Sequence, residues 1–325
     1  MSGYFLSCDW GTSAFRLRLV RVGDMCVLDE VKSSQGMAST FNAWEEHVSN
    51  NDLDRVDFYL KVISEHLAII AQRSDVDVKD VPVVLSGMAS STIGILNMPY
   101  KQLPFNTDGR DLETRWIQRS KEFAHDVLLI SGICNDDDVI RGEETQLIGC
   151  IEGNAKNGEE QLYILPGTHS KHIYVENGSV NHFQTFMTGE FFALLSTKSI
   201  LSSSVAVDSM FDAESFKKGV SAGANTNLLH AAFLTRTNEL FGKNNKAQNY
   251  SYLSGIIIGT ELKDLQGLKK NIYLCCSGNL KKQYEAALDA LGLNERLISY
   301  PSEWIDGSVI RGQLKLLKAK QETHE

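Results

Sequence analysis

A short polar turn near the amino terminus combines residue types that suit the binding of phosphate groups. The stretch CDWGTS places Asp9, Gly11, Thr12 and Ser13 between two apolar segments. A glycine lets backbone N–H groups approach an oxyanion closely, and the two hydroxyl groups can donate to phosphate oxygens. A carboxylate repels phosphates unless a cation lies between them, so Asp9 indicates a magnesium ion that is held through its water molecules.

A second polar turn repeats this pattern in the other half of the chain. Gly167, Thr168 and His169 follow an apolar segment, and a hairpin turn at 177–178 comes after them much as 23–24 comes after the first turn. A lone Asp-Gly-Thr-Ser turn is common in loops without a ligand. The repeat favours the functional interpretation, in which each half of the chain supplies one side of a phosphate clamp.

Strand-like and helical patterns alternate along both halves, which predicts an α/β fold. Each polar turn lies within a predicted meander of three strands, and later patterns include apolar strands at 81–87 and 126–132. We therefore expect two related domains, residues 1–135 and 136–325, that face each other across a cleft. The first domain would hold the first polar turn, and the second domain would hold the other.

The composition excludes several classes of partner. The 325 residues are 42% hydrophobic, and the formal net charge is −9 at pH 7, whereas a nucleic-acid groove or an anionic membrane surface favours a basic face. No apolar stretch approaches the roughly 20 residues of a bilayer span, and no signal-peptide pattern is present. The six cysteines form no C-x-x-C pair, so no zinc site or disulfide framework is indicated. We expect a cytoplasmic protein that acts on small molecules, with a homodimer left open.

The two turns and several other motifs resemble a known family. Residues 9–13 with Arg16, and residues 165–169, resemble the two phosphate loops of the actin-like ATPase and sugar kinase superfamily. A closer resemblance, to 2-dehydro-3-deoxygalactonokinase, rests on the stretches VLSGM (84–88), RGEETQLIG (141–149), LPGTH (165–169) with Lys171, MTGE (187–190) and LSGIIIGTE (253–261). The resemblance covers most of the chain. It implies two ribonuclease H-like, actin-type domains and the ATP-dependent phosphorylation of a 2-keto-3-deoxy sugar acid at its C6 hydroxyl.

Phosphoryl transfer needs a group that accepts the proton of the attacking hydroxyl. Sugar kinases of this superfamily place the acid after a glycine, at the start of the helix before the second loop, which corresponds here to Glu143. Glu144 is the second choice, because it falls within the apolar stripe of the predicted helix, where an acid could be buried and functional. Either glutamate could instead complement the helix dipole without any chemical role.

The remaining candidate residues are assigned to ligands. A substrate carboxylate calls for a guanidinium or a group of amide and hydroxyl donors. The candidates for the sugar acid are Ser86, Gly87, Met88, Ser90, Ser91, Arg141, Thr188 and Glu190. The candidates for Mg²⁺ and ATP are Asp9, Gly11, Thr12, Ser13, Arg16, Gly167, Thr168, His169 and Lys171, with Ser277, Gly278 and Asn279 for the adenine. Arg141 could equally be an exposed arginine at a helix end, and Thr188 a helix cap.

Other functions stay open at this point. The same clamp serves ATP-binding regulators that phosphorylate no sugar, and Glu143 is the residue that favours a kinase over them. A kinase could also act on another keto-deoxy acid or on a neutral aldose. The segment around Gly278 has a single glycine where the superfamily has a glycine-rich turn, which leaves the recognition of the adenine open.

Overall fold

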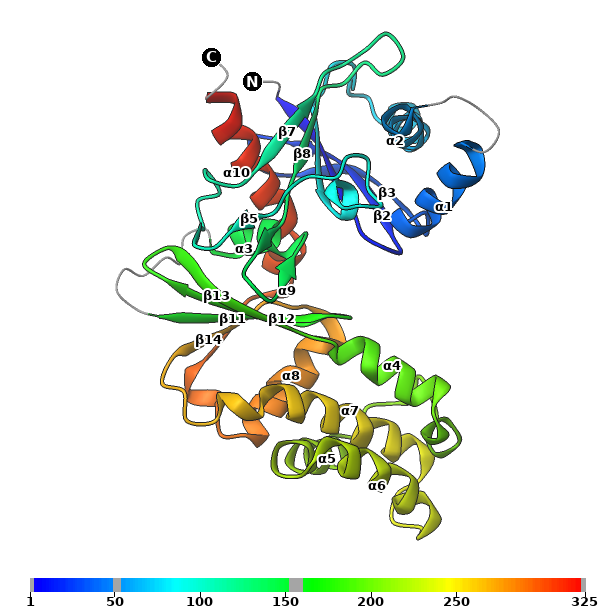
Figure 1. Cartoon of the computed structure of the whole chain (residues 1–325), viewed down its shortest axis with the longest axis vertical. Helices are drawn as coiled ribbons and strands as arrows, with labels where there is room; N and C mark the ends of the chain where they lie inside the picture. The colour runs from blue at the N-terminus through cyan, green and yellow to red at the C-terminus, as the bar shows by residue number, and fades with distance from the viewer. Residues whose placement is uncertain (1–2, 49–53, 152–159, 323–325) are drawn as a thin grey trace. The chain divides into compact units, whose positions relative to one another are not determined.

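The computed structural model describes residues 3–48, 54–151 and 160–322, and its contacts divide the chain into two compact units (Figure 1). Unit 1 comprises Met1–Asn157, Gly178–His182 and Asp306–Glu325. Unit 2 comprises Gly158–Asn177 and Phe183–Ile305. This division differs from the expected boundary at residue 135, because unit 1 extends past that residue and the carboxyl-terminal segment belongs to it as well.

Unit 1 is built on a six-stranded sheet in the order β3–β2–β1–β4–β8–β7. The strands are β1 (Tyr4–Trp10), β2 (Phe15–Arg21), β3 (Val27–Ser33), β4 (Val83–Gly87), β7 (Thr114–Ile117) and β8 (Val127–Ile130). β1, β2 and β3 form the antiparallel meander that the residue pattern predicts, whereas β4 pairs in parallel with both β1 and β8. The carboxyl ends of β1 and β4 therefore lie side by side, with Asp9 opposite Ser86.

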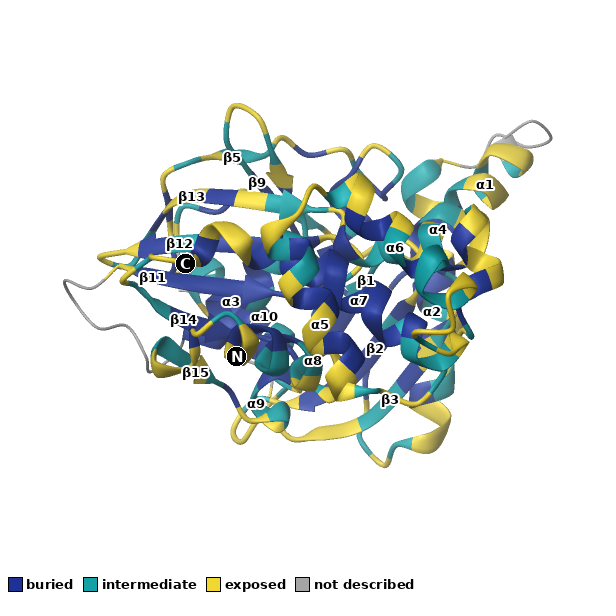
Figure 2. Ribbon diagram, turned by 90° about the horizontal axis from the view of Figure 1, so that it is seen from below, coloured by how far each residue is buried: buried dark blue, intermediate teal, exposed yellow. Residues whose placement is uncertain are grey.

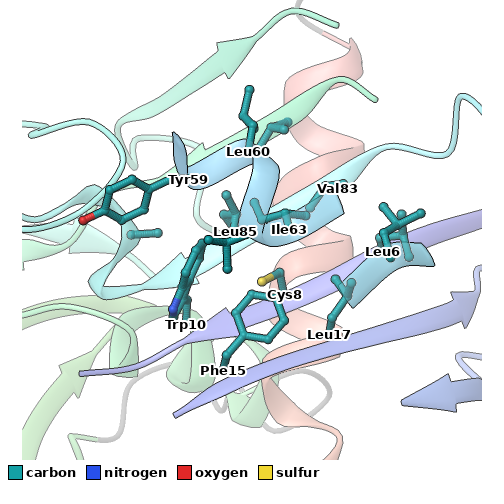
Figure 3. Close-up of a cluster of buried hydrophobic side chains, with 14 of the residues drawn as sticks. Leu6, Cys8, Trp10, Phe15, Leu17, Tyr59, Leu60, Ile63, Val83 and Leu85 are labelled. Atoms are coloured by element: carbon teal, nitrogen blue, oxygen red, sulfur yellow. The ribbon is translucent and has the colours of Figure 1, made fainter. Parts of the chain in front are cut away.

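The core of unit 1 lies between this sheet and the helix α2 (Arg55–Arg73). Trp10, Phe15 and Leu85 from three strands form one cluster with Tyr59 and Ile63 of α2 (Figure 3). Successive strand residues point to opposite faces of the sheet, and the apolar residues of α2 recur at helical spacing, so both patterns supply one apolar face. This packing fixes the directions in which β1 and β2 enter and leave the first polar turn.

Two helices that are distant in sequence pack closely within unit 1. α3 (Glu143–Ile151) contacts α10 (Ser308–Glu322), and a Cβ atom at Gly149 would overlap the carbonyl oxygen of Ser308. From α10, the buried Gln313 donates from Nε2 to Cys8 O (2.8 Å) and to Ser86 Oγ (2.9 Å). These contacts attach the end of the chain to the sheet that carries the first polar turn.

Shorter elements complete unit 1. The 3₁₀ helix η1 (Met88–Ser90) follows β4 directly, and α1 (Met37–Val48) follows the meander. A small sheet consists of β5 (Lys101–Gln102), β9 (Ile133–Cys134) and β10 (Val139–Ile140). β6 (Phe105–Asn106) pairs with Ser179 and Val180, which also belong to unit 1.

Unit 2 repeats the strand order of the first five strands of unit 1. Its sheet has the order β15–β14–β11–β12–β13, with strands β11 (Gln161–Leu165), β12 (Ser170–Glu176), β14 (Asn271–Leu274), β15 (Leu297–Ser299) and β13 (Ser179–Phe186). The contacts assign the first part of β13, up to His182, to unit 1. β12 is antiparallel to β11, and β14 is parallel to both β11 and β15. β11 is buried along its whole length, as Figure 2 shows. The second polar turn thus joins the strands that correspond to β1 and β2, as the sequence repeat predicts.

The helices of unit 2 pack on this sheet and on one another. They are α4 (Thr188–Lys198), η2 (Ile200–Ser204), α5 (Ala213–Asn225), α6 (Leu228–Leu240), α7 (Lys246–Leu262), η3 (Lys263–Leu265), α8 (Gly278–Ala290), η4 (Asn294–Arg296) and α9 (Ser302–Asp306). α5 and α7 approach closely because Gly219 and Gly255 lie at their contact. Throughout the described ranges, no helix is both long and apolar enough to cross a bilayer.

Candidate active site

The first polar turn, residues 11–13, is held by the start of α1. Gly11 O accepts from the N–H of Met37 (2.9 Å), and Thr12 O accepts from the N–H of Ala38 (3.0 Å). The side chains of Thr12 and Ser13 are exposed. The carbonyl groups of the turn are therefore occupied inside the protein, while its two hydroxyl groups remain accessible to a ligand.

Two glycines bring the ends of β1 and β4 next to the start of α3. Gly87 has φ +86°, and a Cβ there would lie 2.7 Å from Trp10 O and 3.4 Å from Asp9 Oδ1. Gly142 has φ +112°, and a Cβ there would lie 3.2 Å from the Cα of Gly87. Both positions need a glycine, for the backbone conformation and for the space. Glu143, the next residue, is thereby placed beside Asp9.

The surroundings of Asp9 raise the pKa of its carboxyl group above the usual value. Burial raises the pKa of its carboxyl group, Arg18 and Arg16 lower it, and Glu143 raises it again. The guanidinium groups of both arginines also contact Glu30, at 2.8 Å from Arg18 Nε and 3.4 Å from Arg16 Nε. Glu143 thus acts electrostatically on Asp9, and a cation near Asp9 would favour the ionised form of the Asp9 carboxyl group.

Glu144 points into the protein, whereas Glu143 does not. Glu144 is 1% exposed; its Oε2 accepts from the N–H of Gly142 (2.6 Å) and its Oε1 from the hydroxyl of Thr145 (2.8 Å). Burial, followed by the charge of Glu143, raises the pKa of Glu144 to about 7. Glu143, the first residue of α3, is partly exposed.

Arg141 organises the turn that follows β4. Its Nη1 donates to the carbonyl and hydroxyl oxygens of Ser90, and its guanidinium carbon lies 4.1 Å from the centre of the Tyr100 ring. Ser90 and Ser91 are buried, and Ser91 Oγ donates to Met88 O (2.7 Å). Ser86 is bonded to Gln313, as described above. Much of the donor capacity expected for a substrate is therefore used within unit 1.

The second polar turn, residues 167–169, is clamped by the first residues of α4. The N–H of Glu190 donates to Thr168 O (3.0 Å), and Glu190 Oε2 lies 2.5 Å from His169 Nε2. A Cβ at Gly189 would lie 2.7 Å from Gly167 O, so the two backbones touch. Thr168 and His169 are exposed.

Two further candidates near the second turn are buried. Lys171 donates from Nζ to His169 O (2.8 Å), so its charge supports the turn from inside. Thr188, the first residue of α4, donates to the carboxylate of Glu261. The sequence predicts a substrate contact or a helix cap for Thr188, but Met187 holds the cap position of α4 and the Thr188 hydroxyl is bonded to Glu261, a residue that no motif singled out.

The adenine candidates lie at the start of α8. Ser277 precedes the helix, Gly278 has φ +65°, and Asn279 is exposed. Asn279 borders a cavity of about 530 Å³, a size typical of small-ligand sites. The other lining residues are Lys282 and Gln283 of α8, Tyr250, Ser251 and Ser254 of α7, and Asp208, Ser209, Met210 and Phe211. These lining residues could not be identified from the sequence, because no local motif connects the three segments.

The described ranges contain no group of three or more His, Cys, Asp and Glu side chains arranged to hold a metal ion. Magnesium keeps most of its water molecules and uses one or two carboxylates together with substrate phosphates. Asp9, with Glu143 close enough to affect its pKa, fits that limited requirement.

The candidates gather in three groups. Unit 1 brings together Asp9, the first turn, the residues after β4, Arg141 and Glu143. Unit 2 brings together the second turn, Lys171, Thr188 and Glu190, and it holds the adenine candidates at the start of α8. The structure adds two residues to the candidates from the sequence: Gln313, which bonds to Ser86, and Glu261, which bonds to Thr188.

Comparisons with known proteins place these groups within one family. A family model described as 2-keto-3-deoxy-galactonokinase matches residues 9–309, which include every candidate residue. "Probable 2-dehydro-3-deoxygalactonokinase DgoK1" of Rhizobium meliloti (strain 1021) is 31% identical over 314 residues, covering 91% of this chain and 92% of the relative. The 2-dehydro-3-deoxygalactonokinase of Escherichia coli (strain K12) is 28% identical over 303 residues, covering 90% and 91%.

A solved structure agrees with the sequence comparisons. It is a crystal structure from Sinorhizobium meliloti that is described as a 2-dehydro-3-deoxygalactonokinase protein. It superposes with a TM-score of 0.79 at 28% identity, covering 98% of this chain and 96% of the other. The similarity therefore extends over both units.

Proposed function

The chain belongs to the 2-keto-3-deoxy-galactonokinase family, and we propose that it transfers the γ-phosphoryl group of ATP to the C6 hydroxyl of 2-dehydro-3-deoxy-D-galactonate. The hydroxyl oxygen attacks the γ-phosphorus, and the bond to the β–γ bridging oxygen breaks. The proton passes to a carboxylate of the protein. The products are ADP and 2-dehydro-3-deoxy-6-phospho-D-galactonate. The observation that carries this proposal is a partly exposed glutamate beside Asp9 at the start of α3.

Glu143 is the proposed proton acceptor. It is partly exposed and follows Gly142, whose backbone lies against the end of β4. The pKa of Glu144, near 7, would also suit a base. However, both oxygens of Glu144 accept hydrogen bonds inside the protein, and a side chain that is 1% exposed does not reach a ligand hydroxyl. Glu144 therefore supports the start of the helix, and Glu143 takes the proton.

The two polar turns are proposed to bind the phosphate groups of ATP. Thr12, Ser13 and Thr168 present exposed side chains on turns whose backbones are anchored by a neighbouring helix. Asp9 would hold Mg²⁺ through water molecules, and the ion would neutralise phosphate charge during transfer. Its presence would also offset the repulsion between Asp9 and Glu143.

For the sugar acid, the proposed binding segment of unit 1 is the turn after β4, and the start of α4 is the separate candidate in unit 2. Arg141 holds Ser90 in place and supplies positive charge to that turn. This charge attracts the substrate carboxylate and distinguishes the acid from a neutral aldose. On the other unit, Glu190 is partly exposed beside the second turn.

The adenosine part of ATP is proposed to occupy the cavity beside Asn279. The cavity combines an aromatic ring at Tyr250, apolar surface at Met210 and Phe211, and polar groups on α7 and α8. Nucleotide sites combine apolar walls with a few oriented polar groups in this way. A segment with a single glycine can then recognise adenine, because α7 and residues 208–211 supply the remaining surface of the cavity.

The proposal is tested by ATP consumption of the purified full-length chain with four acceptors: 2-dehydro-3-deoxy-D-galactonate, its gluconate epimer, galactose and glucose. Turnover confined to the keto-deoxy acids, with the galactonate preferred, supports the proposed substrate. Preference for the epimer or for an aldose would change the assigned substrate, whereas the assignment of kinase activity would stand. ATP binding without turnover on any acceptor would favour a regulator built on the same fold.

Three expectations from the sequence stay predictions. They are the arrangement of two ribonuclease H-like, actin-type domains facing a cleft, a cytoplasmic location, and a homodimer. The shared strand order of the two sheets supports the relatedness of the two domains within the first of them.

A further inference from the structure

A single buried carboxylate connects four elements of unit 2. Glu261, near the end of α7, is 4% exposed. Its Oε1 accepts from Ser170 Oγ (2.8 Å) and lies 2.9 Å from His172 Nε2, both on β12. Its Oε2 accepts from Tyr284 OH on α8 (2.7 Å) and from the hydroxyl of Thr188, the first residue of α4.

These donors keep Glu261 ionised despite its burial. Burial by itself raises the pKa of a carboxyl group, but the hydrogen bonds from His172, Thr188 and Tyr284 outweigh this effect and lower the pKa of Glu261 below its usual value. Hydrogen bonds to a charged acceptor are shorter and stronger than neutral ones. The carboxylate therefore imposes a defined geometry on the elements that donate to it.

Two of these donors lie next to the second polar turn. Ser170 follows the turn directly, as the first residue of β12. Thr188 directly precedes Gly189 and Glu190, whose backbones contact Gly167 and Thr168. A shift of the carboxylate would therefore change both the exit of the turn and the helix start that clamps it.

The donor Tyr284 lies on α8, the helix that lines the cavity. Tyr284 is buried on this helix, and Lys282 and Gln283, the residues just before it, line the cavity of about 530 Å³. Ser254, seven residues before Glu261 on α7, lines the same cavity. Helix α8, which lines the cavity, and strand β12, which follows the turn, are thus both bonded to one side chain of α7.

We propose that Glu261 is a positioning residue that sets the second polar turn and the cavity beside α8 in the relative geometry that one nucleotide requires. The inference rests on the proposed function, because it takes the turn as a phosphate site and the cavity as an adenosine site. Glu261 does not touch the nucleotide. It acts through Ser170, Thr188 and Tyr284, so its loss weakens nucleotide binding more than sugar-acid binding.

The test compares full-length variants in three measurements: the Kd for ADP by calorimetry, KM for ATP and for the sugar acid, and the melting temperature. Glu261→Gln removes the charge at nearly constant volume. Thr188→Val removes one hydroxyl donor, and Thr188→Ser retains it. Gln161→Leu is the matched control, because Gln161 is buried and bonded to Tyr163 and Tyr273 at the end of β11 away from the turn.

We expect Glu261→Gln to raise the Kd for ADP and KM for ATP by about tenfold to a hundredfold, since small misplacements of binding groups have effects of that size. Thr188→Val should show a smaller increase in the same direction, and Thr188→Ser should stay close to the unmodified chain. KM for the sugar acid should rise less than KM for ATP in Glu261→Gln, because Glu261 bonds to the start of α4 but not to Arg141 or the turn after β4. Gln161→Leu should lower the melting temperature without raising the Kd for ADP.

Two results would overturn the proposal. One is unchanged ADP binding in both Glu261→Gln and Thr188→Val, and the other is equal weakening by Gln161→Leu at the same loss of melting temperature. If Glu261→Gln does not fold, the difference in the Kd for ADP between Thr188→Val and Thr188→Ser still tests the proposal. If the unmodified chain binds ADP but phosphorylates none of the acceptors, the proposed function fails while the Kd comparison still tests Glu261. Absence of ADP binding by the unmodified chain would refute both.

Discussion

Replacing Glu144 with glutamine should remove a large part of the pH dependence of folding stability in the weakly acidic range. Glu144 is almost completely buried, and its pKa is raised from 4.5 to about 7 by burial and then by the neighbouring charge of Glu143. The folded chain therefore binds this proton more tightly than the unfolded chain does. The stabilising contribution is fully present below pH 4.5 and is lost as the pH rises to about 7.

The expected magnitude follows from the size of the shift. A difference between 4.5 and about 7 corresponds to about 3 kcal/mol at about 1.4 kcal/mol per pKa unit. The substitution also has a pH-independent cost of roughly 1–3 kcal/mol, because an amide NH₂ replaces one of the oxygens that accept from Gly142 and Thr145. The quantity to measure is therefore the change with pH, not the stability at one pH.

The assay is equilibrium unfolding in urea at several pH values across this range, for the unmodified chain and for Glu144→Gln. The free energy of unfolding of the unmodified chain, minus that of the variant, should fall by about 3 kcal/mol as the pH rises. Glu143→Gln serves as a control: it removes the charge that helps to raise the pKa of Glu144, so the transition should move to lower pH. Parallel stability curves for the unmodified chain and Glu144→Gln would refute the reasoning.

The remaining predictions concern the groups around Glu143. Glu143→Gln should lower kcat by about 10²- to 10⁴-fold with little change in KM for ATP, and near-normal kcat would exclude it as the base. Asp9→Asn should raise the Mg²⁺ concentration needed for half-maximal rate by about tenfold or more, and an unchanged requirement would count against its role. Gly87→Ala should destabilise the chain by several kcal/mol and reduce kcat, whereas Gly267→Ala, with a similar φ but open surroundings, should cost only roughly 1–3 kcal/mol. Equal losses in the two glycine variants, measured by urea unfolding, would contradict the close contact at Gly87.

Local patterns were sufficient to predict the parts of the structure that depend on near neighbours. The alternation of apolar residues predicted β1, β2 and β3, and the repeat around Gly167 predicted the matching strands of unit 2. Strand pairing across a short turn needs no information from elsewhere in the chain, so its signal is complete in a few residues. For the same reason, the start of α3 at Glu143 could be expected from Gly142 and two acidic residues.

Contacts between distant segments could not be predicted in this way. The pairing of α3 with α10 depends on Gly149 lying against Ser308, and a helical glycine has no distinctive pattern when its partner is far along the chain. Gln313 resembles an exposed polar residue in sequence, yet it is buried and bonded to Ser86. These contacts explain why the expected boundary at residue 135 did not match the compact units.

Arg141 illustrates how the structure refines the role that the sequence predicts for a residue. The sequence suggested a direct contact with a substrate carboxylate, or else an exposed arginine at the end of a helix. In the structure Nη1 is committed to Ser90, and Nε and Nη2 lie 3.3 Å from Tyr100 OH and 3.4 Å from Met98 O. Because a guanidinium has five N–H donors in a rigid plane, a side chain held at three nitrogens can shape a turn and still place its charge beside a bound anion. If the acid binds at this turn as proposed, Arg141 would act on it mainly through the turn that it holds, and its charge and the serines after β4 would then act as one feature.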